Sequence, residues 1–243
     1  MDSNNNLKPI FSGIQKFSSI DYPGELSMIL FTGGCNFRCH YCHNPNFVLP
    51  EKIKYKQNQG ILDFLNLRKD TLDAVVICGG EPTIHGQGLI DWIKYIKSLG
   101  YKVKLDTNAT NPKLIKQIID EKIIDFFAID YKASIENYQK VIITKIPELK
   151  EKLFTSLKLI VESKIPYEIR STIHNELHNK DDINQMISEL KELGIDNYFL
   201  QNFVAQNNMV GTIGEGIGTQ TMLKKFKEIL KNNFKESDVR NLD

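Results

Sequence analysis

The sequence lacks both a long apolar run and a large net charge of either sign. No stretch of its 243 residues approaches the length of a transmembrane helix, and residues 1–6 are polar, without the apolar core of a secretion signal. The formal net charge is +1, so no basic field points to nucleic acid. We therefore expect a cytoplasmic protein with no membrane or nucleic-acid partner and a flexible tail over residues 1–12.

Cysteine is also scarce, and three of the four cysteines lie at positions 35, 39 and 42. Such a cluster does not form a disulfide framework, which agrees with a reducing compartment. The hydrophobic fraction of 41% and the charged fraction of 25% are ordinary for a globular protein. Length and composition predict a single domain over residues 13–243.

The three clustered thiolates can converge on one metal centre without help from the rest of the fold. A structural zinc site uses four ligands, and His40 or His43 would have to be the fourth. An iron–sulfur cube held only by protein uses four cysteines. Three cysteines leave one iron without a protein ligand, and a small molecule can bind there. The zinc site is the weaker reading, because no second ligand pair follows at zinc-site spacing.

Six apolar segments alternate with amphipathic segments along the chain. Nearly continuous apolar strands between helices predict a parallel sheet whose outer face is covered by helices. The pattern alone does not distinguish an open sheet from a curved partial barrel. A glycine-rich loop over residues 211–218, either a linker or a mobile segment near a partner, and a final helix would follow. The expected strands are 25–31, 73–78, 102–106, 124–130, 167–173 and 198–201.

Polar motifs follow these strands, and the carboxyl ends of parallel strands share one edge. We therefore expect all of them to meet at that edge. They are the cysteine loop, Gly79-Gly80-Glu81-Pro82, Asp106-Thr107-Asn108, Asp130-Tyr131-Lys132 and the strand that carries Arg170.

Several of these residues have two interpretations. Tyr41 would pack against a nucleobase or only within its loop. His43 would donate to a cofactor or be solvated. Cys78 ends a buried strand and is expected to be a core residue rather than a ligand.

Charged residues near the strand ends also need partners. Asp106 and Asp130, if close together, must share a proton or bind a cation, unless each caps the helix that follows. Arg170 interrupts an apolar strand and suits an anionic carboxylate. For Arg170 an ion pair with Glu168 is not expected, and Asp130 is the structural alternative.

The pattern Cys-x3-Cys-x2-Cys, with Tyr41 before the third cysteine, resembles the signature of the radical S-adenosylmethionine (SAM) enzymes. Gly79-Gly80-Glu81-Pro82 is similar to the "GGEP" motif of that superfamily. The resemblance implies a (β/α)6 partial barrel of the α/β class. It also implies a 4Fe–4S cluster on Cys35, Cys39 and Cys42, and SAM bound at the open iron with its amino group against residues 79–82.

Two further segments resemble the pyruvate formate-lyase activating enzyme, a related radical SAM protein. They are Asp106-Thr107-Asn108 and Asp130-Tyr131-Lys132. The resemblance implies that Asp106, Thr107 and Asp130 hold a monovalent cation beside the SAM carboxylate. It places Asn108 and Lys132 in the same SAM site, and Arg170 is expected to contact the SAM carboxylate.

Residues from about 13 to 203 resemble the longer type of anaerobic ribonucleoside-triphosphate reductase activating protein. The segments that carry this resemblance are "GIQKFSSIDYPG", "FTGGCNFRCHYCHNP", "GGEPT", "LDTNAT", "IDYKA" and "YEIRSTI". Residues 204–218 depart from the pattern of that family. The implied activity is hydrogen abstraction from a glycine Cα of the reductase, a glycyl-radical enzyme. A flavodoxin- or ferredoxin-like protein would supply electrons.

Two alternatives stay open. One is another radical SAM reaction, on a different glycyl-radical enzyme or on a small molecule. The other is a non-enzymatic iron–sulfur or zinc module. A ferredoxin would show a fourth cysteine followed by proline, whereas Pro45 follows Asn44 here.

Overall fold

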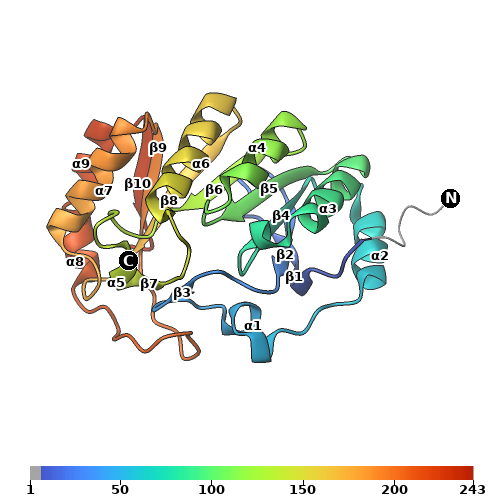
Figure 1. Ribbon diagram of the computed structural model, residues 1–243, viewed down its shortest axis with the longest axis horizontal. Coiled ribbons are helices and arrows are strands. Elements are labelled where there is room, and N and C mark those ends of the chain that lie inside the picture. Colours follow the sequence, from blue (N-terminus) through green and yellow to red (C-terminus); the bar gives the residue numbers. More distant parts are fainter. Residues whose placement is uncertain (1–6, 243) are drawn as a thin grey trace.

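A curved sheet of eight strands forms the centre of the computed structural model, which describes residues 7–242 (Figure 1). The strand order is β1-β2-β4-β5-β6-β8-β9-β10, and every neighbouring pair is parallel except β1 with β2. A separate antiparallel pair joins β3 (Arg38–Cys39) to β7 (Ile142–Ile143). The eight strands are Phe11–Ser18, Ser27–Thr32, Ala74–Gly79, Lys102–Thr107, Phe126–Asp130, Tyr167–Ile173, Asn197–Asn202 and Glu236–Arg240.

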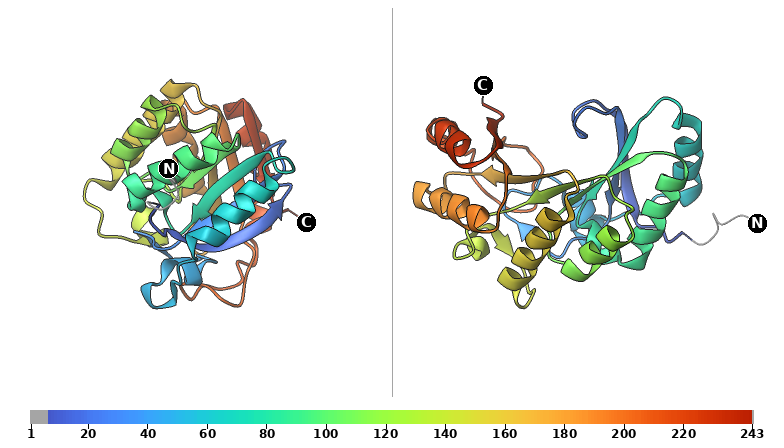
Figure 2. Two further views of the ribbon diagram at one scale, coloured as in Figure 1. Left: turned by 90° about the vertical axis from the view of Figure 1, so that its right-hand side faces the viewer. Right: turned by 90° about the horizontal axis from the view of Figure 1, so that it is seen from above.

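All six expected strands are present, as β2, β4, β5, β6, β8 and β9. Helices follow these strands along one face of the curved sheet, which is the α/β partial barrel that the resemblance implied (Figure 2). The helices are α1 (Pro45–Val48), α2 (Asn58–Arg68), α3 (Gln87–Ser98), α4 (Pro112–Asp120), α5 (Tyr138–Val141), α6 (Leu149–Ser163), α7 (Lys180–Glu192), α8 (Thr219–Lys224) and α9 (Lys227–Asn233), with short 3-10 turns η2 (Pro50–Lys52) and η3 (Pro82–His85).

The core lies between the sheet and these helices. Helix α3 buries Leu89, Trp92, Ile93 and Ile96 completely, because its apolar residues recur with helical spacing. The Trp92 ring also meets Phe11 of β1 edge to face, with 4.9 Å between ring centroids. This packing fixes the outer face of the sheet, and a second, smaller apolar cluster that includes Ile29 and Val76 lies on the other face.

Residues of β5 alternate between the two faces of the sheet. Val103 and Leu105 join the helix-covered core, whereas Lys104 and Asp106 point to the concave face. Glu168 and Arg170 of β8 lie on the same concave face and contact them. The interior of the partial barrel is therefore charged close to the carboxyl ends of its strands.

Two expectations about the chain ends are wrong. Residues 7–12 do not belong to a flexible tail, because Phe11 is fully buried in β1 and the Trp92 indole donates a hydrogen bond to the Lys8 carbonyl (2.8 Å). Residues 1–6 lie outside the described part of the chain. The expected final helix is two short helices, α8 and α9, and β10 follows them beside β9.

The described residues include no helix that is both long and apolar enough to cross a bilayer.

Candidate active site

The cysteine loop begins where β2 ends and is held in place by backbone contacts. Cys39 lies in β3 and pairs with Ile142 of β7. The Arg38 guanidinium donates to the carbonyls of Cys35 and Phe37, each at 2.8 Å. These contacts fix the loop without any metal.

All three clustered thiols line one cavity at the carboxyl ends of β4, β5 and β6. No disulfide joins the described cysteines. The cavity brings together most of the predicted site residues, and it also takes in Phe37, Asn44, Val48 and Cys78. The predicted residues that line it are Cys35, Cys39, Cys42, Gly79, Gly80, Glu81, Asp106, Thr107, Asn108, Asp130 and Lys132.

The cavity suits a cluster with three protein ligands. Burial raises the pKa of the Cys35 thiol to about 12 and that of Cys39 to about 11, so without a metal both are protonated near pH 7. Binding iron would displace those protons. Within residues 7–242 no three His, Cys, Asp or Glu side chains come close enough to hold one metal ion. Ligands of a cluster bind different irons, so they stand farther apart than the ligands of one zinc ion.

The glycine pair after β4 is required by close packing against the cysteine loop. Gly79 has a φ of +114°, and a Cβ on Gly80 would lie 1.9 Å from the Gly34 carbonyl oxygen. The Glu81 amide donates to that same carbonyl at 2.8 Å. The resemblance implied that the SAM amino group lies against residues 79–82, and the structure adds a reason for the glycines within the protein itself.

Glu81 connects the ends of β4 and β5. Its buried carboxylate accepts four hydrogen bonds, from the Thr83 amide (3.0 Å), the Thr83 hydroxyl (2.6 Å), the Thr107 hydroxyl (2.6 Å) and the Asn108 amide (2.7 Å). Burial raises the pKa of Glu81, and these hydrogen bonds act against it. The side chains of Glu81 and Thr107 therefore bind each other.

Asn108 connects the hydrogen-bonded group around Glu81 to the cysteine loop. Its amide group donates to the Asn36 side chain at 2.7 Å, and Asn36 in turn donates to the Thr110 hydroxyl at 2.8 Å. Asn36 directly follows Cys35. The motifs after β4 and β5 thus position the first of the three cysteines.

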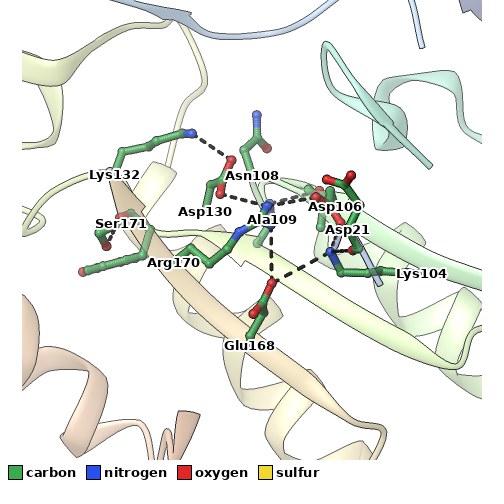
Figure 3. Close-up of polar contacts among 12 residues, drawn as sticks. Asp21, Lys104, Asp106, Asn108, Ala109, Asp130, Lys132, Glu168, Arg170 and Ser171 are labelled. Atoms are coloured by element: carbon green, nitrogen blue, oxygen red, sulfur yellow. Dashed lines mark hydrogen bonds and ion pairs between the residues drawn. The ribbon is translucent and has the colours of Figure 1, made fainter. Parts of the chain in front are cut away.

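A row of charged side chains crosses the concave face beside the cavity (Figure 3). Arg170 Nη2 lies 2.9 Å from Asp106 Oδ2 and 3.3 Å from Asp130 Oδ1, and Lys132 Nζ lies 3.0 Å from Asp130 Oδ2. Burial alone would raise the pKa of Asp130, but Lys132 and Arg170 outweigh it and lower the pKa to about 2. Asp130 is therefore ionised at neutral pH.

One expectation about these charges is wrong, and one alternative is excluded. Arg170 Nη1 does contact Glu168 Oε1 (3.4 Å), because both side chains point into the barrel from one strand. The aspartates do not cap the following helices either. Asn111 caps α4 by accepting from the Leu114 amide, and Asn137 is at the N-cap of α5.

The sequence analysis missed Lys104. Its side chain is 2% exposed, and its ammonium lies 2.9 Å from Asp106 Oδ1 as an ion pair without hydrogen-bond geometry. Glu168, also missed as a site residue, is close to both Lys104 and Arg170. The available signal was the spacing, because Lys104 stands two residues before Asp106 and shares its face.

Four predicted residues do not line the cavity. Arg170 reaches it only through Asp106 and Asp130. Pro82 begins the turn η3. Tyr41 is buried, and its ring lies 6.4 Å from the Phe203 ring between centroids, which favours packing within the protein over contact with a nucleobase.

His43, the fourth, packs beside the Phe203 ring at 5.5 Å between ring centroids. Burial lowers its pKa, so the imidazole favours its neutral form.

Comparison with known proteins agrees with this geometry. The family model of the radical SAM superfamily matches residues 29–226. A protein of Methanocaldococcus jannaschii, provisionally named as a glycyl-radical enzyme activating enzyme, is 34% identical over 201 residues, which is 81% of each chain. The pyruvate formate-lyase-activating enzyme of Staphylococcus aureus is 30% identical over 151 residues, covering 58% of this chain and 59% of that one.

Solved structures share the fold at low sequence identity. The structure of TYW1 with a lysine–pyruvate adduct has a TM-score of 0.63 at 17% identity, over 86% of this chain and 74% of the other. The structure of anSMEcpe with bound SAM has a TM-score of 0.64 at 15% identity, over 86% and 59% of the two chains. With the family match over most of its length, the chain belongs to the radical SAM superfamily and is related to the glycyl-radical enzyme activases.

Proposed function

We propose that this protein activates a glycyl-radical enzyme, and that its partner is an anaerobic ribonucleoside-triphosphate reductase. The observation that carries the proposal is the single cavity in which three thiols meet the Gly79-Gly80 turn, Asp130 and Lys132. The relatives named as glycyl-radical enzyme activases support the reaction class. The choice of reductase rests on the motifs of the sequence.

Cys35, Cys39 and Cys42 would hold a 4Fe–4S cluster, and SAM would occupy the cavity beside it. When bound and reduced by an external electron donor, the cluster supplies the electron that splits SAM into methionine and a 5′-deoxyadenosyl radical. The chemistry supplied there would be abstraction of a hydrogen atom from a glycine Cα of the partner, which would leave a glycyl radical on the partner and give 5′-deoxyadenosine.

In that reaction the residues of this chain would bind SAM, orient it and shield it from water. Lys132 lines the cavity and would provide positive charge for the SAM carboxylate, whereas Arg170 acts through Asp106 and Asp130, which hold it in place. Phe37 and Val48 line the cavity and exclude water from part of its wall. The Glu81 carboxylate keeps the ends of β4 and β5 together.

The cysteine count supports a simple activase. Three cysteines would bind the cluster, and Cys78, on the cavity wall, is the one that remains. The chain therefore has no second cysteine set for an auxiliary cluster. A flavodoxin- or ferredoxin-like protein is the proposed electron donor, and a cytoplasmic location stays a prediction.

The test is anaerobic incubation of the cluster-loaded protein with SAM, a reductant and candidate glycyl-radical enzymes. Electron paramagnetic resonance (EPR) should show a glycyl doublet on the anaerobic reductase. A doublet that forms only on pyruvate formate-lyase would keep the activase reading and change the partner, which the similarity to pyruvate formate-lyase-activating enzymes makes the second candidate. No doublet on any candidate, together with active SAM cleavage, would point to a small-molecule substrate.

A further inference from the structure

The four carboxylate oxygens of Asp106 and Asp130 each face a cationic side chain of this chain (Figure 3). Asp106 Oδ1 lies 2.9 Å from Lys104 Nζ, and its Oδ2 lies 2.9 Å from Arg170 Nη2. Asp130 Oδ1 lies 3.3 Å from Arg170 Nη2, and its Oδ2 lies 3.0 Å from Lys132 Nζ. None of the four oxygens is left without a positive partner.

Lys104 is fixed at this position by burial. Its side chain is 2% exposed, and its ammonium donates to the Asp21 backbone carbonyl at 2.8 Å and lies 3.8 Å from Glu168 Oε1. A buried ammonium is costly unless carboxylates and carbonyls surround it, so Lys104 cannot leave Asp106 without a large penalty. The Lys104 side chain is therefore held beside Asp106 as part of the site.

Cationic side chains of the chain itself outnumber the carboxylates of this cluster. Three carboxylates lie among three cations, and Arg240 of β10 adds a further positive charge at Glu168 Oε2 (2.8 Å). A metal cation placed at Asp106 would also be repelled by the ammonium of Lys104. The carboxylates are Asp106, Asp130 and Glu168, and the cations are Lys104, Lys132 and Arg170.

The residues present thus do not fit the monovalent cation that the sequence resemblance implied at Asp106, Thr107 and Asp130. The Thr107 hydroxyl, moreover, donates to Glu81 and accepts from the Ala109 amide (3.1 Å), so one of its two lone pairs is already used. We propose instead that Lys104 and Arg170 together take the place of that cation, so that this protein binds SAM without K⁺ or Na⁺. Lys104 is a positioning residue that acts through Asp106. The proposal rests on the SAM-binding part of the proposed function and not on the identity of the partner.

The experiment measures SAM affinity of the anaerobically cluster-loaded protein by equilibrium dialysis with labelled SAM. The buffer contains KCl, NaCl or tetramethylammonium chloride at one ionic strength, so that screening is the same in all three. The expected Kd values agree within about twofold, because the cation is built into the chain. A gain of about tenfold or more in K⁺ or Na⁺ would overturn the inference.

A variant tests the role of Lys104 itself. Lys104→Met keeps the length of the side chain and removes its charge, so SAM affinity should fall in tetramethylammonium and recover in K⁺ or Na⁺. Lys102→Met is the matched control, since Lys102 lies on the same strand with its side chain half exposed and paired to Glu25. It should behave like the wild type in every salt. A folded Lys104→Met protein with no salt preference and unchanged affinity would contradict the role of Lys104.

Two outcomes separate this inference from the proposed function. A wild-type protein that binds SAM only in K⁺ or Na⁺ would overturn the inference and leave the activase proposal intact. A wild-type protein that binds SAM in none of the salts would overturn both. The wild-type comparison is decisive even where Lys104→Met does not fold.

Discussion

The backbone amide of Val210 donates a 2.9 Å hydrogen bond to the carbonyl of Cys42. The glycine-rich segment after β9 is therefore fastened to the cysteine loop. Further along the same segment, the His174 ring lies 3.0 Å from the Gly214 carbonyl oxygen. These contacts place the segment beside the cysteine loop, and a role of the segment at the border of the site stays a prediction.

The first prediction concerns this segment. Gly211→Ala would place a Cβ 2.6 Å from the His40 carbonyl oxygen and push the segment away from the cysteine loop. We expect the yield of glycyl radical on the partner to fall, while iron content and SAM cleavage without partner stay unchanged, because the thiols are not moved. Gly60→Ala is the control, since its Cβ would meet nothing within 4 Å. Equal radical yields in both variants would make the segment a linker.

The second prediction concerns the cluster. Anaerobically reconstituted protein should contain about four irons and no stoichiometric zinc. Replacing Cys35, Cys39 or Cys42 by Ala should abolish the iron, because a cube with two protein ligands is not retained. Cys78→Ala should keep it, although Cys78 lies on the same cavity wall. Metal and sulfide analysis checks this, and a full zinc complement without sulfide would refute the cluster.

The third prediction concerns Glu81. Glu81→Gln places an amide N–H₂ where the carboxylate accepts four hydrogen bonds, so buried donors lose their acceptor. The free energy of unfolding of the cluster-free protein should fall by about 1–3 kcal/mol. Urea denaturation measures this, with the exposed Glu51→Gln as control. A free energy of unfolding equal to that of the control would show that the hydrogen bonds of Glu81 between β4 and β5 do not stabilise the protein.

The fourth prediction concerns pH. The folded pKa of Asp130 is lowered to about 2, against about 3.9 in the unfolded chain. Its contribution to stability is therefore complete above about pH 4 and is lost as the pH falls toward 2. The stability difference between wild type and Asp130→Asn should shrink over that window in denaturant titrations. For Asp120→Asn, an exposed control on α4, no such change is expected. A stability difference between wild type and Asp130→Asn that does not change with pH would contradict the ion pairs of Asp130 with Lys132 and Arg170.

The sequence predicted the six core strands because four are short apolar runs bounded by turn residues, and Lys102–Thr107 and Tyr167–Ile173 carry apolar residues at alternate positions between helices. It missed β1 and β10, since Phe11–Ser18 and Glu236–Arg240 are largely polar and lie at the two edges of the sheet. An edge strand is covered on fewer sides, and its pattern resembles that of a loop.

The site motifs could be placed at one edge of the sheet because parallel strands end together. The partners of the charged residues could not be predicted. Lys104 stands in the segment Lys-Val-Lys-Leu-Asp, where alternation suggests that both lysines face water. Only the curvature of the sheet buries Lys104 among Asp106, Glu168 and Arg170. The same curvature brings Glu168 and Arg170 together on the inner face.

The most direct test of the central claim follows the hydrogen atom. A partner anaerobic ribonucleoside-triphosphate reductase is produced with α-deuterated glycine and incubated with the reduced, cluster-loaded protein and SAM. Mass spectrometry of the released 5′-deoxyadenosine should find one deuterium transferred from the partner, together with a glycyl radical in the EPR spectrum. Unlabelled 5′-deoxyadenosine and no glycyl radical would contradict the proposal that this protein activates that enzyme.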